Sequence, residues 1–328
     1  MIKVSTLRGA LRDRLGRWAT APDGKARPDA PFGRGPFAAR VLGRVIDAAA
    51  FLGCRLPRPV ASVFAAIGGH AEWALRPGKR RTLAENLAHA IGSPPSSAAA
   101  VRDLVRREVV NEARRSVDLL WAIGRPTSLL ANVEVIGVEN AVAALARGKG
   151  MVLAGAHVGG WEVVAAVPAA VLPAPTTVLV ADNWLAWAIQ HVRTTSGLRV
   201  AYRTASPVAL ARVLQRGEAL LVLGDDATGA DPRRHRVRFC DSYAALPSGV
   251  VTLARLTEAP IVPFAVLPMG PRRWRGVLEP PIEPPPRDSG IEGEADALQQ
   301  LADRWGALVQ AHPDQWAASF PIAWDTVR

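Results

Sequence analysis

A change of pattern near residue 131 constrains the fold of this chain more than any other feature. From residue 37 to 130, alanine-rich stretches with helical spacing are broken by RLPRP, LRPGK and GSPPSS, each of which ends a helix. Beyond this point, short apolar runs such as VEVIG, MVLAGA and ALLVLG alternate with helical segments, as in βαβ units. The sequence therefore predicts an α/β fold in which a central mixed, largely parallel sheet is flanked by helices and preceded by a helical region.

The domain organisation follows from how apolar residues are distributed. Residues 1–36 combine a basic amphipathic pattern with a joint rich in Pro, Gly and charge, so they form either a membrane-binding helix or a basic tail. Apolar runs are then spread evenly, and 49% of the 328 residues are hydrophobic, which is enough for one large core. We expect residues 37–328 to form a single domain, with a helical part to residue 130 and an α/β part from residue 131.

The net charge of +11 would draw the protein toward anionic lipid or nucleic acid. No nucleic-acid motif is present, and aromatic residues are not interleaved with the basic clusters, so an anionic membrane surface is the expected partner. Two cysteines and scattered histidines predict neither a disulfide framework nor a metal site. Without a signal-peptide core, we expect a peripheral protein at the cytoplasmic side of the membrane.

His157 is the candidate catalytic residue. A buried strand delivers it to the carboxyl edge of the sheet, where open α/β sheets bind ligands. Gly159 and Gly160 allow a tight turn, so the carboxylate of Glu162 can return to the imidazole. A carboxylate on one ring nitrogen fixes the tautomer and leaves the other nitrogen to take a proton from a hydroxyl. The pair is the predicted dyad, although this spacing also fits a core histidine and a glutamate at a helix start.

An ordered set of segments runs between residues 76 and 324. They are RRTLAENL, AHVGGWE, Asp182 with Asn183, Arg193, RGEALLVLGDD, VRFCDSYAALPSGVVTLA, IVPFAV and HPDQWAASFPIAW. In this order they resemble the late lipid A acyltransferases and the related phosphatidylinositol mannoside acyltransferases, of the lysophospholipid-acyltransferase-like superfamily. The chain departs from the family pattern at Asp225-Asp226-Ala227, where the family has Asp-x-Asp.

The resemblance implies an acyltransferase in which His157 is the general base and Glu162 orients it. The acceptor hydroxyl of a glycolipid or phospholipid would attack the thioester of acyl-CoA or of an acyl carrier protein, with no other cofactor. Charge that develops on the carbonyl oxygen needs hydrogen-bond donors, for which the backbone N–H groups near the glycine pair and Arg193 are candidates. The full set of expected substrate-binding residues is Gly159, Gly160, Trp161, Arg193, its competitor Arg203, and Asp225.

Alternative functions stay open at this point. Ala227 allows a catalytically degenerate relative that binds lipid, and the charge allows a basic nucleic-acid-binding protein. An α/β hydrolase is disfavoured because Ser248 lies in LPSGV, which lacks the Gly-x-Ser-x-Gly elbow. The sequence leaves open whether the acceptor is a lipid A precursor or a phosphatidylinositol mannoside.

Overall fold

The computed structural model describes residues 2–3, 37–92, 98–163, 167–183, 186–187, 189–190, 193, 197–226, 228 and 233–325. Strand β1 (Ile2–Lys3) is the part of the predicted N-terminal arm that is described. The amphipathic helix and the joint predicted for the rest of residues 1–36 lie outside the described residues.

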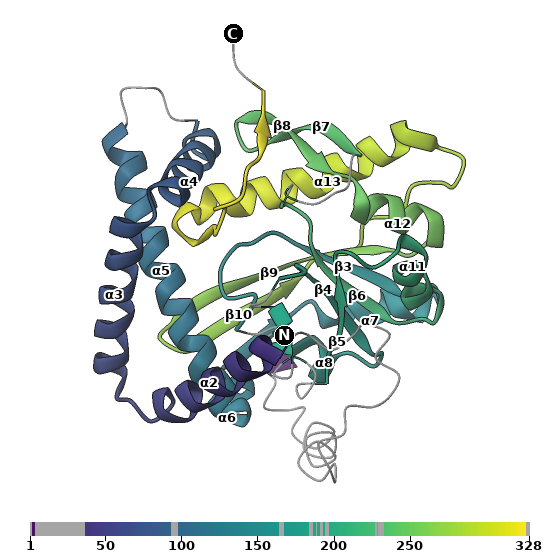
Figure 1. Ribbon diagram of the computed structural model, residues 1–328. Helices are drawn as coiled ribbons and strands as arrows, with labels where there is room; N and C mark the ends of the chain where they lie inside the picture. Colours follow the sequence, from purple (N-terminus) through teal and green to yellow (C-terminus); the bar gives the residue numbers. More distant parts are fainter. Residues whose placement is uncertain are drawn as a thin grey trace.

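The helical N-terminal region is confirmed. Its helices are α2 (Phe37–Gly53), α3 (Arg58–Leu75), α4 (Pro77–Ala90), α5 (Ala98–Gly124) and α6 (Pro126–Ala131). Prolines lie in the first turns of α3, α4 and α6, where the missing N–H has no intrahelical partner to lose. In Figure 1, α3 and α5 run side by side along one edge of the molecule, and α2 lies across their lower end.

The predicted mixed, largely parallel sheet is also confirmed, and within the described residues it has eight strands in the order β1-β2-β10-β9-β3-β6-β4-β5. Its further strands are β2 (Val133–Ile136), β3 (Met151–Gly155), β4 (Thr176–Val180), β5 (Arg199–Tyr202), β6 (Ala219–Leu223), β9 (Ile261–Gly270) and β10 (Arg273–Leu278). The run from β9 to β5 is parallel throughout, whereas β10 is antiparallel to β9 and β1 to β2. The carboxyl ends of five neighbouring strands therefore meet at one edge.

A second, antiparallel sheet of three strands lies beside the last long helix (Figure 1). Its strands are β7 (Arg234–Phe239), β8 (Ser242–Pro247) and β11 (Ala323–Trp324). The remaining helices are α7 (Val138–Ala146), α8 (Val167–Val171), α11 (Pro207–Gln215), α12 (Gly249–Thr257), α13 (Gly290–Ala311) and the 3₁₀ turn η3 (Pro313–Gln315). Because β11 pairs with β8, the segment after η3 is tied to this small sheet.

Helices cover both faces of the large sheet, and side-chain alternation decides what each face meets. Val152 and Ala154 of β3 pack into a core shared with α4, α11, α12 and α13. Met151 and Leu153 point to the opposite face, which α7 covers. Among the described residues, no helix combines the length and apolar character needed to cross a bilayer.

Candidate active site

The turn that follows β3 is fixed by its two glycines. Gly159 has φ +70°, and a Cβ there would lie 1.9 Å from the carbonyl oxygen of Val266, so only glycine fits. Its N–H donates to Gln315 O at 2.9 Å, and the N–H of Gly160 donates to Val266 O at 3.1 Å. Both N–H groups are already used within the fold. This corrects the expectation that they are free to stabilise a developing oxyanion.

Strand register brings His157 beside Asp225. Strands β3 and β6 are parallel neighbours in which Gly155 pairs with Leu223, so the residues two positions further along lie at the same level. Imidazole Nδ1 is 2.7 Å from Asp225 Oδ1. An ionised carboxylate can only accept a hydrogen bond. Nδ1 therefore carries the hydrogen that it donates to Asp225, and Nε2 has a lone pair. In the described part of the chain, no hydrogen bond to Nε2 is found.

Asp225 is held in one orientation by three donors. The side chain is fully buried, and Oδ2 accepts from the backbone N–H of His157 at 3.0 Å and from Trp316 Nε1 at 2.9 Å. Hydrogen bonds offset the desolvation of a buried carboxylate, and those to a charged acceptor are strong. The site therefore has a rigid carboxylate that sets the position of the imidazole.

The predicted dyad is corrected by this geometry, because the carboxylate on the imidazole is Asp225 and not Glu162. Glu162 Oε1 instead accepts from Arg193 Nη2 at 2.7 Å. The ring of Trp161, which precedes Glu162 in the chain, packs edge-on against His157 with centroids 5.2 Å apart. The turn thus carries Glu162 past the imidazole, where a permanently charged guanidinium is a stronger partner than neutral imidazole.

The protonation of His157 reflects opposing influences. Burial lowers its pKa. The charge and hydrogen bond of Asp225 and the charge of Asp226 outweigh this effect, so the pKa is raised overall. Arg203 acts in the opposite sense and lowers it. The cation that acts on His157 is thus the one that sequence reasoning ranked second.

Arg203 belongs to a polar group at the same carboxyl edge of the sheet. It follows β5, and its Nη1 lies 2.7 Å from Asp226 Oδ2. Asp226 has a lowered pKa: burial raises it, but hydrogen bonds from Thr228 and the charge of Arg203 prevail. Asp182, which follows β4, accepts from Thr204 Oγ1 at 2.7 Å. Among the described residues, no group of three or more His, Cys, Asp or Glu side chains could hold a metal ion.

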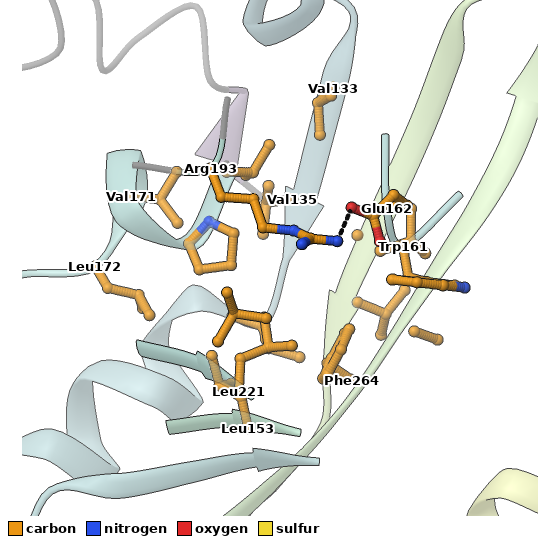
Figure 2. A pocket seen from close by; sticks show the side chains of 18 residues that line it. Val133, Val135, Leu153, Trp161, Glu162, Val171, Leu172, Arg193, Leu221 and Phe264 are labelled. Atoms are coloured by element: carbon orange, nitrogen blue, oxygen red, sulfur yellow. Dashed lines mark hydrogen bonds and ion pairs between the residues drawn. The ribbon is translucent and has the colours of Figure 1, made fainter. Parts of the chain in front are cut away.

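An apolar cavity opens beside the histidine, on the face of the sheet that carries α8. Its empty space is about 680 Å³, including the part open to solvent. Among its walls are Val135, Leu153, Val171, Leu221 and Phe264. Figure 2 shows these side chains around Arg193, whose guanidinium reaches across to Glu162. Trp161 contacts both the cavity and the imidazole.

Arg193 is 8% exposed and is a wall of this cavity, as is Glu162. The sequence made this arginine a candidate donor to the developing oxyanion. The structure pairs it with Glu162 and places its Nη1 3.4 Å from the carbonyl oxygen of Ala186. Its described partners are thus within the protein.

Sequence reasoning assigned no role to two aromatic residues near the histidine, Trp316 and Phe320. The first donates to Asp225, and the ring of the second lies 5.1 Å from the imidazole. Buried Asn86 of α4 donates to the carbonyl oxygens of Ala318 and Phe320 and so anchors this segment. The sequence did contain a signal for these residues. Two segments of the family resemblance hold them: RRTLAENL contains the asparagine, and HPDQWAASFPIAW contains the two aromatic residues.

A histidine with a buried carboxylate on one nitrogen and a free lone pair on the other is the arrangement of an enzyme that activates a hydroxyl or thiol. Residues 45–318 match the model of the bacterial lipid A biosynthesis acyltransferases. The chain therefore belongs to this family, which agrees with the O-acyltransferase class expected from its sequence.

Two individual proteins are similar to this chain. It is 34% identical over 124 residues to the phosphatidylinositol mannoside acyltransferase of Mycolicibacterium smegmatis, a match that spans 37% of this chain and 40% of that protein. The crystal structure of the 1-acyl-sn-glycerophosphate acyltransferase PlsC from Thermotoga maritima aligns over 78% of this chain and 98% of its own, at 12% identity. The TM-score of this alignment is 0.37.

Proposed function

We propose that this protein transfers a fatty acyl group from an acyl thioester, acyl-CoA or an acyl carrier protein conjugate, to a hydroxyl of a glycolipid or phospholipid. It acts as a peripheral protein at the cytoplasmic face of a bacterial membrane. Family membership supports the reaction class. There are two candidate acceptors. One is a phosphatidylinositol mannoside, named for the relative from Mycolicibacterium smegmatis, and the other is a lipid A precursor, named in the family description.

The observation that carries the proposal is the imidazole of His157, which has Asp225 on Nδ1 and no described hydrogen-bond partner on Nε2, next to an apolar cavity. Nε2 takes the proton of the acceptor hydroxyl as its oxygen adds to the thioester carbonyl. The Asp225 carboxylate stabilises the imidazolium that results. When the carbon–sulfur bond breaks, the imidazolium returns the proton to the departing thiolate.

The negative charge on the carbonyl oxygen requires a donor. Arg203 is the preferred candidate, because it is close enough to lower the pKa of His157 and its side chain is partly exposed. Its pairing with Asp226 fixes the guanidinium without filling all five of its N–H groups. Arg193 is assigned to the cavity instead.

The cavity is the proposed site for the acyl chain. Its apolar walls suit a hydrocarbon, and Trp161 joins it to the imidazole, so a chain in the cavity would lead its thioester toward His157. The Glu162–Arg193 pair is then a polar group in the wall of an apolar site. It helps to position the acyl chain and takes no part in proton transfer. Gly159 and Gly160 serve by allowing the turn.

The proposal is tested with the purified full-length protein, radiolabelled acyl-CoA or acyl carrier protein conjugates, and detergent-dispersed bacterial lipids. His157→Ala should lower turnover about 10²–10⁴-fold, the usual loss when a general base is removed. His70→Ala is the matched control, because that histidine is exposed on α3, and it should retain full turnover. Equal turnover of His157→Ala and wild type would reject the mechanism, and lipid binding without turnover by wild type would identify a degenerate, binding-only relative.

A further inference from the structure

Helices α2 and α3 expose an unusual amount of apolar surface. Among the described residues, 16 large hydrophobic side chains are exposed, and 10 of them lie between residues 41 and 75. The exposed fraction is 59% for Phe64, 61% for Ile67 and 65% for Leu52. Scattered exposed hydrophobic residues are normal, but a contiguous set on two successive helices indicates an interaction site.

Helix α3 buries its small residues and exposes its large apolar residues, which is the opposite of an ordinary surface helix. Its buried face consists of the small residues Ala61, Ala65 and Gly69, which let it approach α5 closely. A Cβ on Gly69 would lie 2.8 Å from the Cα of Val110. The large apolar residues recur at helical spacing on the outer face, as Val60, Val63, Phe64 and Ile67. Water therefore meets the side of the helix that would normally be its core face.

The same arrangement continues into α2. Ala50 is buried in α2, and Val41, Val45 and Leu52 lie on the opposite side of the helix. We call the outer apolar residues of α2, α3 and the turn between them the α2–α3 face; they are Val41, Val45, Phe51, Leu52, Leu56, Val60, Val63, Phe64, Ile67 and Leu75. Figure 1 shows that α3 forms an outer edge of the molecule.

The charges around this face favour one kind of partner. Exposed arginines border it within α2, at the α2–α3 junction and at the end of α3; they are Arg44, Arg55, Arg58 and Arg76. On α3 the acidic residue is Glu72, which turns inward to Lys79 of α4 at 3.0 Å. The guanidinium of Arg55 covers the ring of Phe51 at 3.6 Å, which combines a charge with an apolar surface. An apolar stripe bordered by arginines is the pattern of helices that lie in the interface of an anionic bilayer.

The α2–α3 face is also joined to the cavity. Cys54 belongs to one apolar cluster with Trp121, Val133 and Trp274, and Val133 is a wall of the cavity. We infer that the α2–α3 face docks onto a bilayer that contains anionic phospholipid and so brings the cavity next to the lipid. The choice of lipid as partner rests on the proposed function. The face itself is distinct from the catalytic residues and from the N-terminal arm.

The test compares two double variants of the full-length chain that remove similar apolar surface and add the same charge. Phe64→Glu/Ile67→Glu changes the face, and Val208→Glu/Ile291→Glu changes exposed residues of α11 and α13 that are 60% and 71% exposed. Co-flotation is measured with vesicles of phosphatidylcholine plus phosphatidylglycerol and of phosphatidylcholine alone. The first variant should bind the anionic vesicles about tenfold more weakly, because two large apolar side chains no longer enter the lipid. The second should bind as wild type, and added salt should weaken wild-type binding.

Other occupants of the face give different results. If both variants bind vesicles equally well, the inference is overturned. It is also overturned if lipid-free wild type is a dimer that Phe64→Glu/Ile67→Glu separates without loss of vesicle binding, since the face is then an interface between copies. Deleting residues 4–30 provides the third comparison: if the deletion removes all binding that the face variant retains, the arm is the anchor.

Turnover with detergent-dispersed lipid separates this inference from the proposed function. Phe64→Glu/Ile67→Glu should keep wild-type turnover there, because docking is bypassed. Wild type that binds vesicles through the face but transfers no acyl group would refute the function and leave the docking surface intact. Full acyl transfer with no difference between the variants in flotation would support the function and refute the docking surface.

Discussion

The two carboxylates Asp225 and Glu162 show how differently one fold uses the same chemical group. Asp225, at the carboxyl edge of the sheet, is fully buried and accepts from three donors, one of which is the imidazole of His157. Glu162, in the cavity wall, keeps 21% of its side chain exposed and pairs with Arg193. The first is arranged to influence a proton, whereas the second neutralises a cation within an apolar site.

The difference teaches that nearness in sequence does not select the partner of a catalytic histidine. Glu162 is five residues from His157, and Asp225 is 68 residues away. A buried carboxylate stabilises a charged imidazole strongly because little solvent screens it. Four experiments can break or sharpen the contrast between the two carboxylates.

The largest effect is expected for Asp225→Asn. The amide keeps the size of the side chain but loses the charge that stabilises the imidazolium, so turnover should fall roughly 10²–10⁴-fold. Glu162→Gln should lower turnover less than about tenfold, because it does not touch the proton. Initial rates of acyl transfer measure both. Equal losses for the two variants would return Glu162 to the dyad.

Trp316→Phe should have the next largest effect. Phenylalanine keeps most of the ring but removes the Nε1–H donor, which leaves Oδ2 of Asp225 with one partner fewer. The free energy of unfolding should fall by about 1.5–3 kcal/mol, as for other bonds to charged groups, and turnover by about tenfold. Trp324→Phe is the control, since its indole donates to Asn86 and not to Asp225. Turnover that falls equally in both variants would argue against a specific role of Trp316.

Arg193→Ala should act mainly on stability. It leaves Glu162 unpaired in an apolar wall, and the free energy of unfolding should fall by about 1–2 kcal/mol, below the roughly 3–5 kcal/mol of a fully buried pair. Arg193→Lys should lose less, because the charge remains. Urea unfolding measures each value. Arg199→Ala is the control, since Glu218 retains Arg216. A large loss of turnover in Arg193→Ala at full stability would instead place the arginine on the substrate.

The smallest effect is a displacement of the pH profile. The general base must be neutral, so the acidic limb of kcat/KM rises as pH passes the raised pKa of His157. Asp225→Asn removes the charge that raises this pKa and should move the limb to lower pH. Arg203→Gln removes a charge that lowers it and should move the limb to higher pH. Glu162→Gln should leave the limb in place, and a shift there would show that its charge reaches the imidazole.

Much of the fold was predictable because it depends on local pattern. The alternation of apolar runs after residue 131 predicted the parallel strands, and the glycine pair predicted the tight turn after His157. The polar ends of β5 and β6 were also identified, since Arg203 and Asp225 were already candidates. The second sheet was not predicted: β7 and β8 form a hairpin, and the pairing of β11 with β8 joins segments that are distant in the sequence.

Sequence by itself determined the kind of architecture, the position of His157 at a strand end, and the family. Tertiary structure decided which carboxylate faces the imidazole, since the order β3-β6-β4-β5 places β6 next to β3 although two strands intervene along the chain. It also decided that the N–H groups of Gly159 and Gly160 are occupied and that Arg193 pairs with Glu162. Hydrophobic period is a local property of neighbouring residues, whereas hydrogen-bond partners depend on strand order and register, which only the packed chain fixes.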